Sequence, residues 1–189
     1  MYSGKTTVAR QLARHINEHY GIDTEWFDTD QAVEERYHLT VADCFRRYGE
    51  QMFRSLETTV LHSVSETGDQ NDDSMVKTRP PRLKIISTGG GTPCSGDNMQ
   101  WMLDHGLVVY LRLGVDAIVK RMSVSHKPRP MLSNMSQSQR IEHIHDQLVR
   151  RLPIYQEAHL TFDAEEPDVA AVSQAVVDWF AMRQKDYPE

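Results

Sequence analysis

The sequence is poor in cysteine, in long apolar runs and in positive charge, and each shortage argues against a class of protein. The two cysteines, Cys44 and Cys94, lie far apart and suggest no disulfide framework, so we expect a reducing, cytoplasmic environment. No apolar run approaches the roughly 18–20 residues that span a bilayer. The opening MYSGKTT lacks the apolar core of a secretion signal. Lysine and arginine number 21 against 27 acidic residues, and this balance argues against a nucleic-acid partner because no basic excess would neutralise its phosphates.

What the sequence does contain is the composition of one globular domain. Its 189 residues are 39% hydrophobic and 25% charged. A chain of this length buries a single well-formed core. We therefore predict one domain over residues 1–189.

Helical and strand patterns alternate along the chain. Val8, Leu12, Ile16 and Tyr20 recur every four residues and predict a helix over 5–20 that ends at Gly21. Alternation of strands with helices predicts an α/β fold with three layers, in which helices cover both faces of a parallel sheet. The predicted strands lie at 26–27, 83–87, 107–111 and 159–162, and the further helices at about 40–48, 50–64, 96–105, 115–122, 140–151 and 168–184.

Two polar segments interrupt this alternation. Residues 66–82 are turn-rich and end in a proline pair, which indicates a solvated surface insertion. Residues 123–139 contain Pro128-Arg129-Pro130 and indicate a loop.

Half of a phosphate-binding loop opens the chain. The full pattern is G-x-x-x-x-G-K-[ST] between a strand and a helix, and Gly4-Lys5-Thr6 matches its second half at the start of the first predicted helix. In such a loop the backbone N–H groups and the helix N-terminus hold phosphate oxygens. Lys5 would then reach the β- and γ-phosphates, and the Thr6 hydroxyl would ligate Mg²⁺.

The other half of the loop pattern is missing. Its first glycine would fall ahead of Met1, and no strand precedes Gly4 in the sequence. Taken alone, GKT at a helix start is also a fair chance match. We expect a misplaced start, in which the in-frame codons upstream encode an apolar strand ending in Gly-x-x.

Two carboxylates follow the first predicted strand. At the carboxyl edge of a parallel sheet, Asp28 and Asp30 would face a ligand crevice. One can hold Mg²⁺ through water while the other orients or deprotonates an acceptor hydroxyl. The plainer interpretation is a helix cap, since Asp-Thr-Asp caps a helix well.

Three further clusters suit an anionic acceptor. Arg54 lies three residues before Glu57, a spacing that also fits an ordinary surface ion pair. The run Gly89–Gly91 lets backbone approach a ligand, although a flexible turn is its plainer interpretation. Arg129 and Arg151 can each take a carboxylate or a phosphate in a bidentate contact.

Together and in this order, these clusters resemble the shikimate kinase family. Its members carry a phosphate loop and then D-T-D, G-E-x-x-F-R-x-x-E, G-G-G, R-P-L-L and R-x-P-L-Y-x-E. The corresponding stretches here are GKTT at 4–7, DTD at 28–30, GEQMFRSLE at 49–57, GGG at 89–91, RPML at 129–132 and RLPIYQE at 151–157. Nearly the whole chain is covered, except for the 66–82 insertion and the C-terminal helix.

The resemblance implies an activity: ATP- and Mg²⁺-dependent phosphorylation of shikimate to shikimate 3-phosphate, in the biosynthesis of chorismate and the aromatic amino acids. It also implies a monomer that binds no nucleic acid and no membrane.

The resemblance assigns roles by position. Ser3, Gly4, Lys5, Thr6 and Thr7 would hold the nucleotide, and Thr6 and Asp28 the Mg²⁺. The catalytic residues would be Lys5, Asp30 and Arg129, with Arg129 on a mobile lid formed by 123–139. Arg121 would flank the adenine. Asp30, Arg54, Gly90, Gly91 and Arg151 would bind shikimate, with the two arginines on its carboxylate.

The missing segment also has an implied consequence. In this family the strand before the phosphate loop is the central one of five parallel strands, so its loss would remove ladder hydrogen bonds on two sides and open the core. Two alternatives therefore stay open: another small-metabolite kinase of the same fold, such as a gluconokinase, and a truncated protein that binds without catalysing.

Overall fold

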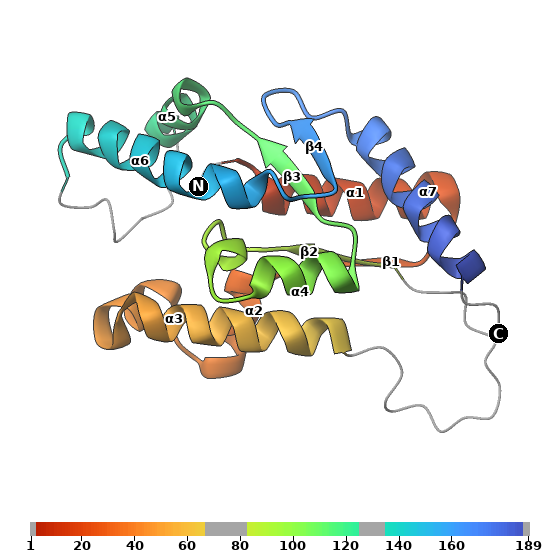
Figure 1. The fold of residues 1–189 in the computed structure, drawn as a ribbon, viewed down its shortest axis with the longest axis horizontal. Coiled ribbons are helices and arrows are strands. Elements are labelled where there is room, and N and C mark those ends of the chain that lie inside the picture. The colour runs from red at the N-terminus through yellow and green to blue at the C-terminus, as the bar shows by residue number, and fades with distance from the viewer. Residues whose placement is uncertain (1–2, 67–82, 125–134, 187–189) are drawn as a thin grey trace.

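The computed structural model describes residues 3–66, 83–124 and 135–186, which form an α/β fold (Figure 1). The predicted insertion falls on 67–82, outside the described residues except for its first position. Most of the predicted lid loop, with Arg129, lies outside them as well.

The first helix follows the predicted boundaries. Helix α1 spans Lys5–Tyr20 and buries Val8, Leu12 and Ile16 on one face. Gly21 ends it in the left-handed region with φ of 66°, a conformation that glycine adopts without a steric penalty.

A helix that the sequence analysis missed follows the first strand. Strand β1 spans Thr24–Asp28, and α2 spans Thr29–Tyr37 immediately after it. The Asp28 side chain caps α2 by accepting hydrogen bonds from the backbone of Asp30 and Gln31. The capping interpretation of Asp-Thr-Asp is therefore confirmed, but apolar periodicity in α2 is too weak to predict the helix it caps.

Helix α3 joins two predicted helices into one element. It spans Val41–Glu66 with a break at Gly49, whose φ of 79° and ψ of 176° are not helical. The predicted helices at about 40–48 and 50–64 correspond to the two sides of this break.

Two of the remaining helices begin a few residues away from their predicted starts, whereas the helix predicted from 115 begins at Val115. The helix predicted from 96 begins at Asn98, after a short 3₁₀ turn, and the one predicted from 140 begins at Gln137 because Ser136 and Gln139 form a capping box. The predicted loop 123–139 is thus too long at both ends. These elements are η1 Thr92–Cys94, α4 Asn98–His105, α5 Val115–Val124, α6 Gln137–Tyr155 and α7 Val169–Asp186.

Four strands form two separate parallel sheets among the described residues. Strand β2 (Leu83–Ser87) pairs with β1, and β3 (Val109–Arg112) pairs with β4 (Leu160–Asp163). Only Leu83 and Ser87 of β2 are buried, whereas the three residues between them are half-buried. These three residues, Lys84, Ile85 and Ile86, line an apolar cavity between β2 and β3.

One layer of helices holds the two sheets together. Val8 and Leu12 of α1 and Val172 of α7 form a buried cluster that packs against Ile85 of β2 and Val109 of β3. Helices α3 and α4 lie on the opposite side of β1 and β2 from α1 (Figure 1). The predicted three-layer α/β arrangement with parallel strands is confirmed. No helix in the described part of the chain is both long and apolar enough to cross a membrane.

Candidate active site

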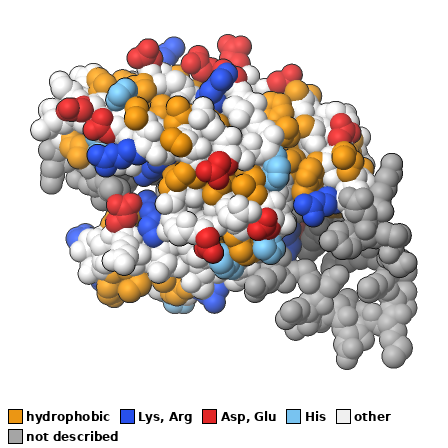
Figure 2. Space-filling model, viewed as in Figure 1, with side chains coloured by type: hydrophobic (Ala, Val, Ile, Leu, Met, Phe, Trp, Pro, Cys, Tyr) orange, Lys and Arg blue, Asp and Glu red, His pale blue; other side chains and the backbone are white. Residues whose placement is uncertain are grey.

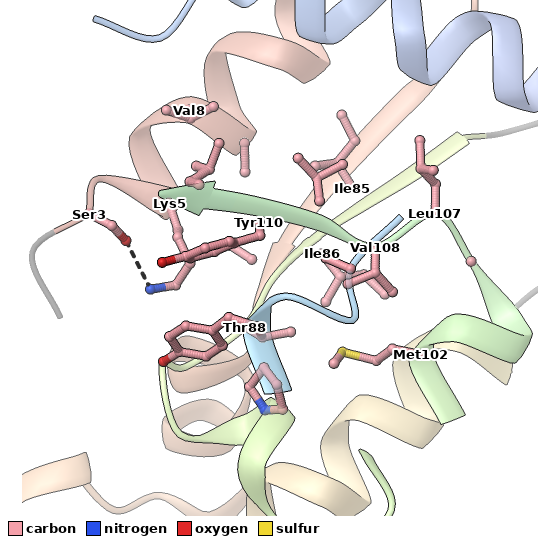
Figure 3. Close-up of a pocket in the computed structure, with 18 of the residues that line it drawn as sticks. Ser3, Lys5, Val8, Ile85, Ile86, Thr88, Met102, Leu107, Val108 and Tyr110 are labelled. Atoms are coloured by element: carbon pink, nitrogen blue, oxygen red, sulfur yellow. Dashed lines mark hydrogen bonds between the residues drawn. The ribbon is translucent and has the colours of Figure 1, made fainter. Parts of the chain in front are cut away.

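The amino end of α1 has the shape of a phosphate-binding turn. Gly4 precedes the helix with φ of 79°, and its carbonyl accepts a hydrogen bond from the Val8 N–H at 2.9 Å. The Lys5 ammonium donates to the Ser3 hydroxyl at 3.3 Å, and both side chains lie at the same end of a cavity (Figure 3). A side chain at Gly4 would lie 3.4 Å from the Arg121 guanidinium, so the predicted adenine-flanking arginine does reach the loop. Arg121 also donates to the Ala164 carbonyl.

Three oxygen-bearing side chains meet beside this turn. The Thr6 hydroxyl donates to Asp28 Oδ2 at 2.6 Å and lies 3.5 Å from the Ser87 hydroxyl. The other oxygen of Asp28 accepts the cap hydrogen bonds of α2, from Asp30 N at 3.0 Å and Gln31 N at 3.3 Å. Asp28 is thus a cap and a partner of the phosphate turn at once. Hard, neutral or anionic oxygens of this kind suit Mg²⁺, which takes few ligands from the protein and keeps waters and phosphate oxygens.

Arg54 is the centre of a partly buried ion-pair network on α3. Its guanidinium donates to Glu57 Oε2, while Nη2 and Nε donate to Glu50 Oε1 at 3.0 Å and 3.3 Å. The Glu57 side chain is 0% exposed and that of Glu50 is 50% exposed. The interpretation as an ordinary surface ion pair is therefore wrong for Glu57.

Burial and charge oppose each other in this network. Burial raises the pKa of Glu57, and the charge of Arg54 and a hydrogen bond from Thr92 only partly offset it. Burial alone would lower the pKa of Arg54, but Glu57 and Glu50 outweigh it and raise that pKa. Removing either partner would leave the other as a poorly compensated buried group.

The glycine run packs directly against this network. A side chain at Gly91 would overlap the Arg54 guanidinium, and one at Gly89 would overlap Glu57 and lie 3.0 Å from Asp30 Oδ1. Thr92, directly after the run, donates to Glu57 Oε1 at 2.8 Å. The absence of side chains thus lets the chain after β2 pack against α3. The predicted approach of these glycines to a ligand stays a prediction.

Helix α6 reaches the same glycines from the other side. The Tyr155 hydroxyl donates to the Gly90 carbonyl and is also hydrogen-bonded by Arg151. Burial raises the pKa of the Cys94 thiol, and the charges of Arg151 and Arg54 oppose this rise. Arg54 lies against Gly91, and Arg151 reaches Gly90 through the Tyr155 hydroxyl, so the two arginines, 97 positions apart in sequence, both lie beside the glycine run. A protonated thiol is a poor nucleophile, which leaves Cys94 as a neighbour of the site.

Most predicted site residues within the described part of the chain lie along one edge. The turn of α1, Asp28, Asp30 and the glycine run all sit at the carboxyl ends of β1 and β2. Thr7 is exposed, and the contacts of the turn come from its neighbours. Ser87, Thr92 and Tyr155 were missed as individual site residues. Tyr155 lies within the quoted RLPIYQE, whereas nothing in the sequence marks Ser87 or Thr92.

Charged side chains of both signs are scattered over the face in Figure 2, with apolar side chains between them. That face carries no broad field of one sign.

Comparison with known proteins identifies the family. The sequence pattern of the family described as shikimate kinase matches residues 1–181. The chain belongs to the shikimate kinase family. Curated shikimate kinases from Phocaeicola vulgatus and Parabacteroides distasonis are each 36% identical to it, over 98% and 94% of this chain and 93% of each relative.

Solved structures agree with the family assignment. A shikimate kinase from Bacteroides thetaiotaomicron superposes with a TM-score of 0.75 at 29% identity, over 96% of this chain and 94% of that one. A second, from Acinetobacter baumannii in complex with shikimate, gives 0.72 at 27% identity over 97% and 90%. The predicted family and fold class are confirmed.

Proposed function

We propose that this chain transfers the γ-phosphoryl group of ATP to a hydroxyl of shikimate. The observation that carries the proposal is the junction of two half-sites at one sheet edge. Thr6 and Asp28 meet at the phosphate turn, and Arg54 and Arg151 both lie beside the glycine run, the second through Tyr155. The first pair suits a metal-bound nucleotide and the second a carboxylate.

The nucleotide half of the proposal uses the start of α1. The N–H groups that follow Gly4 and the helix dipole would hold phosphate oxygens, with Lys5 on the β- and γ-phosphates and Ser3 and Thr7 at the rim. Thr6 and Asp28 would hold Mg²⁺, which neutralises charge on the phosphates when bound. The Thr6 hydroxyl proton already points to Asp28, which leaves its lone pairs available for the metal.

The acceptor half contains a competitor for the substrate. Half-exposed Glu50 occupies the Nε–Nη2 edge of Arg54, which is the edge that a carboxylate takes in a bidentate pair. Buried Glu57 forms a salt bridge with Nη1 of Arg54. We infer that the shikimate carboxylate displaces Glu50 while Glu57 keeps the guanidinium in place, with Arg151, Gly90 and Gly91 completing the pocket.

The transfer itself needs a base for the hydroxyl proton and cations that stabilise the charge developing on the phosphoryl group. Asp30 would accept the proton of the shikimate hydroxyl as its oxygen bonds to the γ-phosphorus. The bond from that phosphorus to the β–γ bridging oxygen breaks, and ADP leaves with the electron pair. Lys5 would stabilise the charge that develops, and Arg129, outside the described residues, would add a second cation. We place this reaction in the cytoplasm and assign it to a monomer by resemblance to the family.

A coupled ADP-release assay with shikimate or gluconate tests the proposal. We expect turnover with shikimate and Mg²⁺ only, and a loss of about 10²-fold or more for Lys5→Ala, because it removes a charge that stabilises the transition state. Lys120→Ala, an exposed lysine on α5, is the matched control and should leave the rate unchanged. Turnover with gluconate alone would show that the chain is a gluconokinase instead. Shikimate binding without ADP release would identify a non-catalytic binding protein.

A further inference from the structure

A fully buried amide lies between the neighbouring helices α3 and α4 (Figure 1). It belongs to Asn98, the first residue of α4, which is 0% exposed. Its Nδ2 donates to the Thr58 hydroxyl of α3 and to the Thr92 carbonyl of η1, each at 2.9 Å. Its Oδ1 is buried and accepts no hydrogen bond among the described residues, so the side chain does not cap its own helix. Asn98 is thus a double donor to two other elements.

The chemistry of its partners fixes the direction of this amide. The Thr92 carbonyl oxygen can only accept, so the nitrogen end of Asn98 must face it. A reversed amide would place Oδ1 against that carbonyl, with no proton between the two acceptors. A buried acceptor without a partner lowers stability, so a side chain that served packing alone would be apolar here. The two donated hydrogen bonds are therefore what the amide contributes.

Both hydrogen bonds continue to Arg54. The Thr58 hydroxyl passes its own proton to the Arg54 carbonyl at 3.0 Å, which links Asn98 to the backbone of the arginine. The Thr92 hydroxyl donates to Glu57 Oε1 at 2.8 Å. The other oxygen of Glu57 accepts from the Arg54 guanidinium, so this second route ends at the charged group. Asn98 thus connects to both ends of one long and otherwise adaptable side chain.

We propose that Asn98 is a positioning residue for shikimate, which holds the Arg54 guanidinium in the orientation that receives the substrate carboxylate. The inference rests on the proposed function, in which Arg54 binds that carboxylate. A guanidinium that is held in advance loses less conformational freedom when the substrate binds, and the affinity rises accordingly. Because the carboxylate lies away from the reacting hydroxyl, Asn98 acts on the binding of shikimate and leaves the chemical step unchanged.

A kinetic comparison tests the role of the amide. We expect Asn98→Ala to raise the KM for shikimate about tenfold, with kcat and the KM for ATP within about twofold of the parent values. Gln100→Ala is the matched control, because Gln100 is an exposed amide on the same helix that donates only to Asp104 and should leave all three constants unchanged. Asn98→Ser leaves a smaller cavity and still lacks the amide, and it gives the same test if Asn98→Ala does not fold.

A double-mutant cycle tests the route through Thr58. Thr58→Val removes the hydroxyl and keeps the shape of the side chain. It should raise the KM for shikimate several-fold in the parent, but by less than about twofold when added to Asn98→Ala, because the link is already broken. Full effects of both substitutions in the double variant would contradict this route.

A spectroscopic readout is independent of turnover. Arg54 Nε donates to Glu50, so the NMR signal of this N–H reports the position of the guanidinium, and its loss in Arg54→Lys identifies it. In Asn98→Ala we expect the signal to shift and to exchange with water several-fold faster, and in Gln100→Ala to stay in place. An unchanged signal, or an unchanged KM for shikimate, would overturn the inference. If the parent chain showed no turnover of shikimate, the proposed function would fail, and the Arg54 signal would still decide whether Asn98 positions the guanidinium.

Discussion

At the scale of single residues, Arg54 has two roles that a single substitution cannot separate. It is the proposed carboxylate ligand, and it also neutralises Glu57, whose side chain is 0% exposed. Arg54→Ala therefore removes a substrate contact and at the same time leaves the buried Glu57 carboxylate without its cationic partner. Loss of one partner of a buried pair costs about 3–5 kcal/mol.

A double substitution separates the two roles. We expect Arg54→Ala alone to lower the free energy of unfolding by about 3 kcal/mol and to raise the KM for shikimate at least tenfold. Adding Glu57→Gln should restore much of the stability, because the amide carries no charge, and should leave the KM high. Urea denaturation and shikimate titration measure the two effects. If stability and KM recovered together, Arg54 would be structural only.

Gly91 shows how a missing side chain shapes the site. Its φ of −96° is ordinary for any residue, so an added methyl group acts only through its collision with the Arg54 guanidinium. We expect Gly91→Ala to raise the KM for shikimate by about tenfold with a smaller change in kcat, since the displaced group binds the substrate and not the reacting phosphorus. Gly114→Ala, where nothing lies within 4 Å of the new methyl group, is the matched control and should match the parent enzyme. An unchanged KM in Gly91→Ala would show that Arg54 does not bind shikimate.

At the scale of elements, the features that local sequence patterns determine were predicted well. The features that depend on contacts between residues distant in sequence were missed. Helix α1 follows its predicted bounds because four-residue periodicity and a terminal glycine are both local. Helix α2 was missed because its apolar face is weak. The burial of Glu57 was missed because it depends on Thr92 and on the bare glycines, 32 or more positions away.

The link between α6 and β2 is also invisible in sequence spacing, and it makes Tyr155 a positioning residue. Its hydroxyl holds the Gly90 carbonyl and lies beside Arg151, so it fixes the glycine run relative to the second arginine. We expect Tyr155→Phe to cost about 1 kcal/mol of stability and to raise the KM for shikimate several-fold at nearly constant kcat. Tyr110→Phe, on the ring that packs against Tyr155 at 5.1 Å, is the control. A fall in kcat with an unchanged KM would argue for a role in the chemical step.

The pKa of Tyr155 gives a second readout of the same link. Burial raises this pKa against the opposing charge of Arg151. A raised pKa in the folded state means that the contribution of Tyr155 to stability is complete below its ordinary pKa near 10 and is lost as pH rises through the folded value. The free energy of unfolding should therefore fall above about pH 10, and by less in Tyr155→Phe than in the parent chain.

At the scale of the whole molecule, the core has well-packed regions and an open one, an apolar cavity of about 540 Å³ lined by β2 and β3. Ile16 of α1 is 0% exposed, whereas Ile86 of β2 is half-buried and lines the cavity. Truncation of a fully packed isoleucine to alanine costs about 2–5 kcal/mol, because the transfer term and the new cavity add together. At Ile86 a cavity already exists, so only part of the transfer term is lost. We expect Ile16→Ala to lower the free energy of unfolding by about 3 kcal/mol and Ile86→Ala by about 1 kcal/mol, both measured by urea denaturation. An equal cost at the two positions would show that Ile86 is packed as tightly as Ile16.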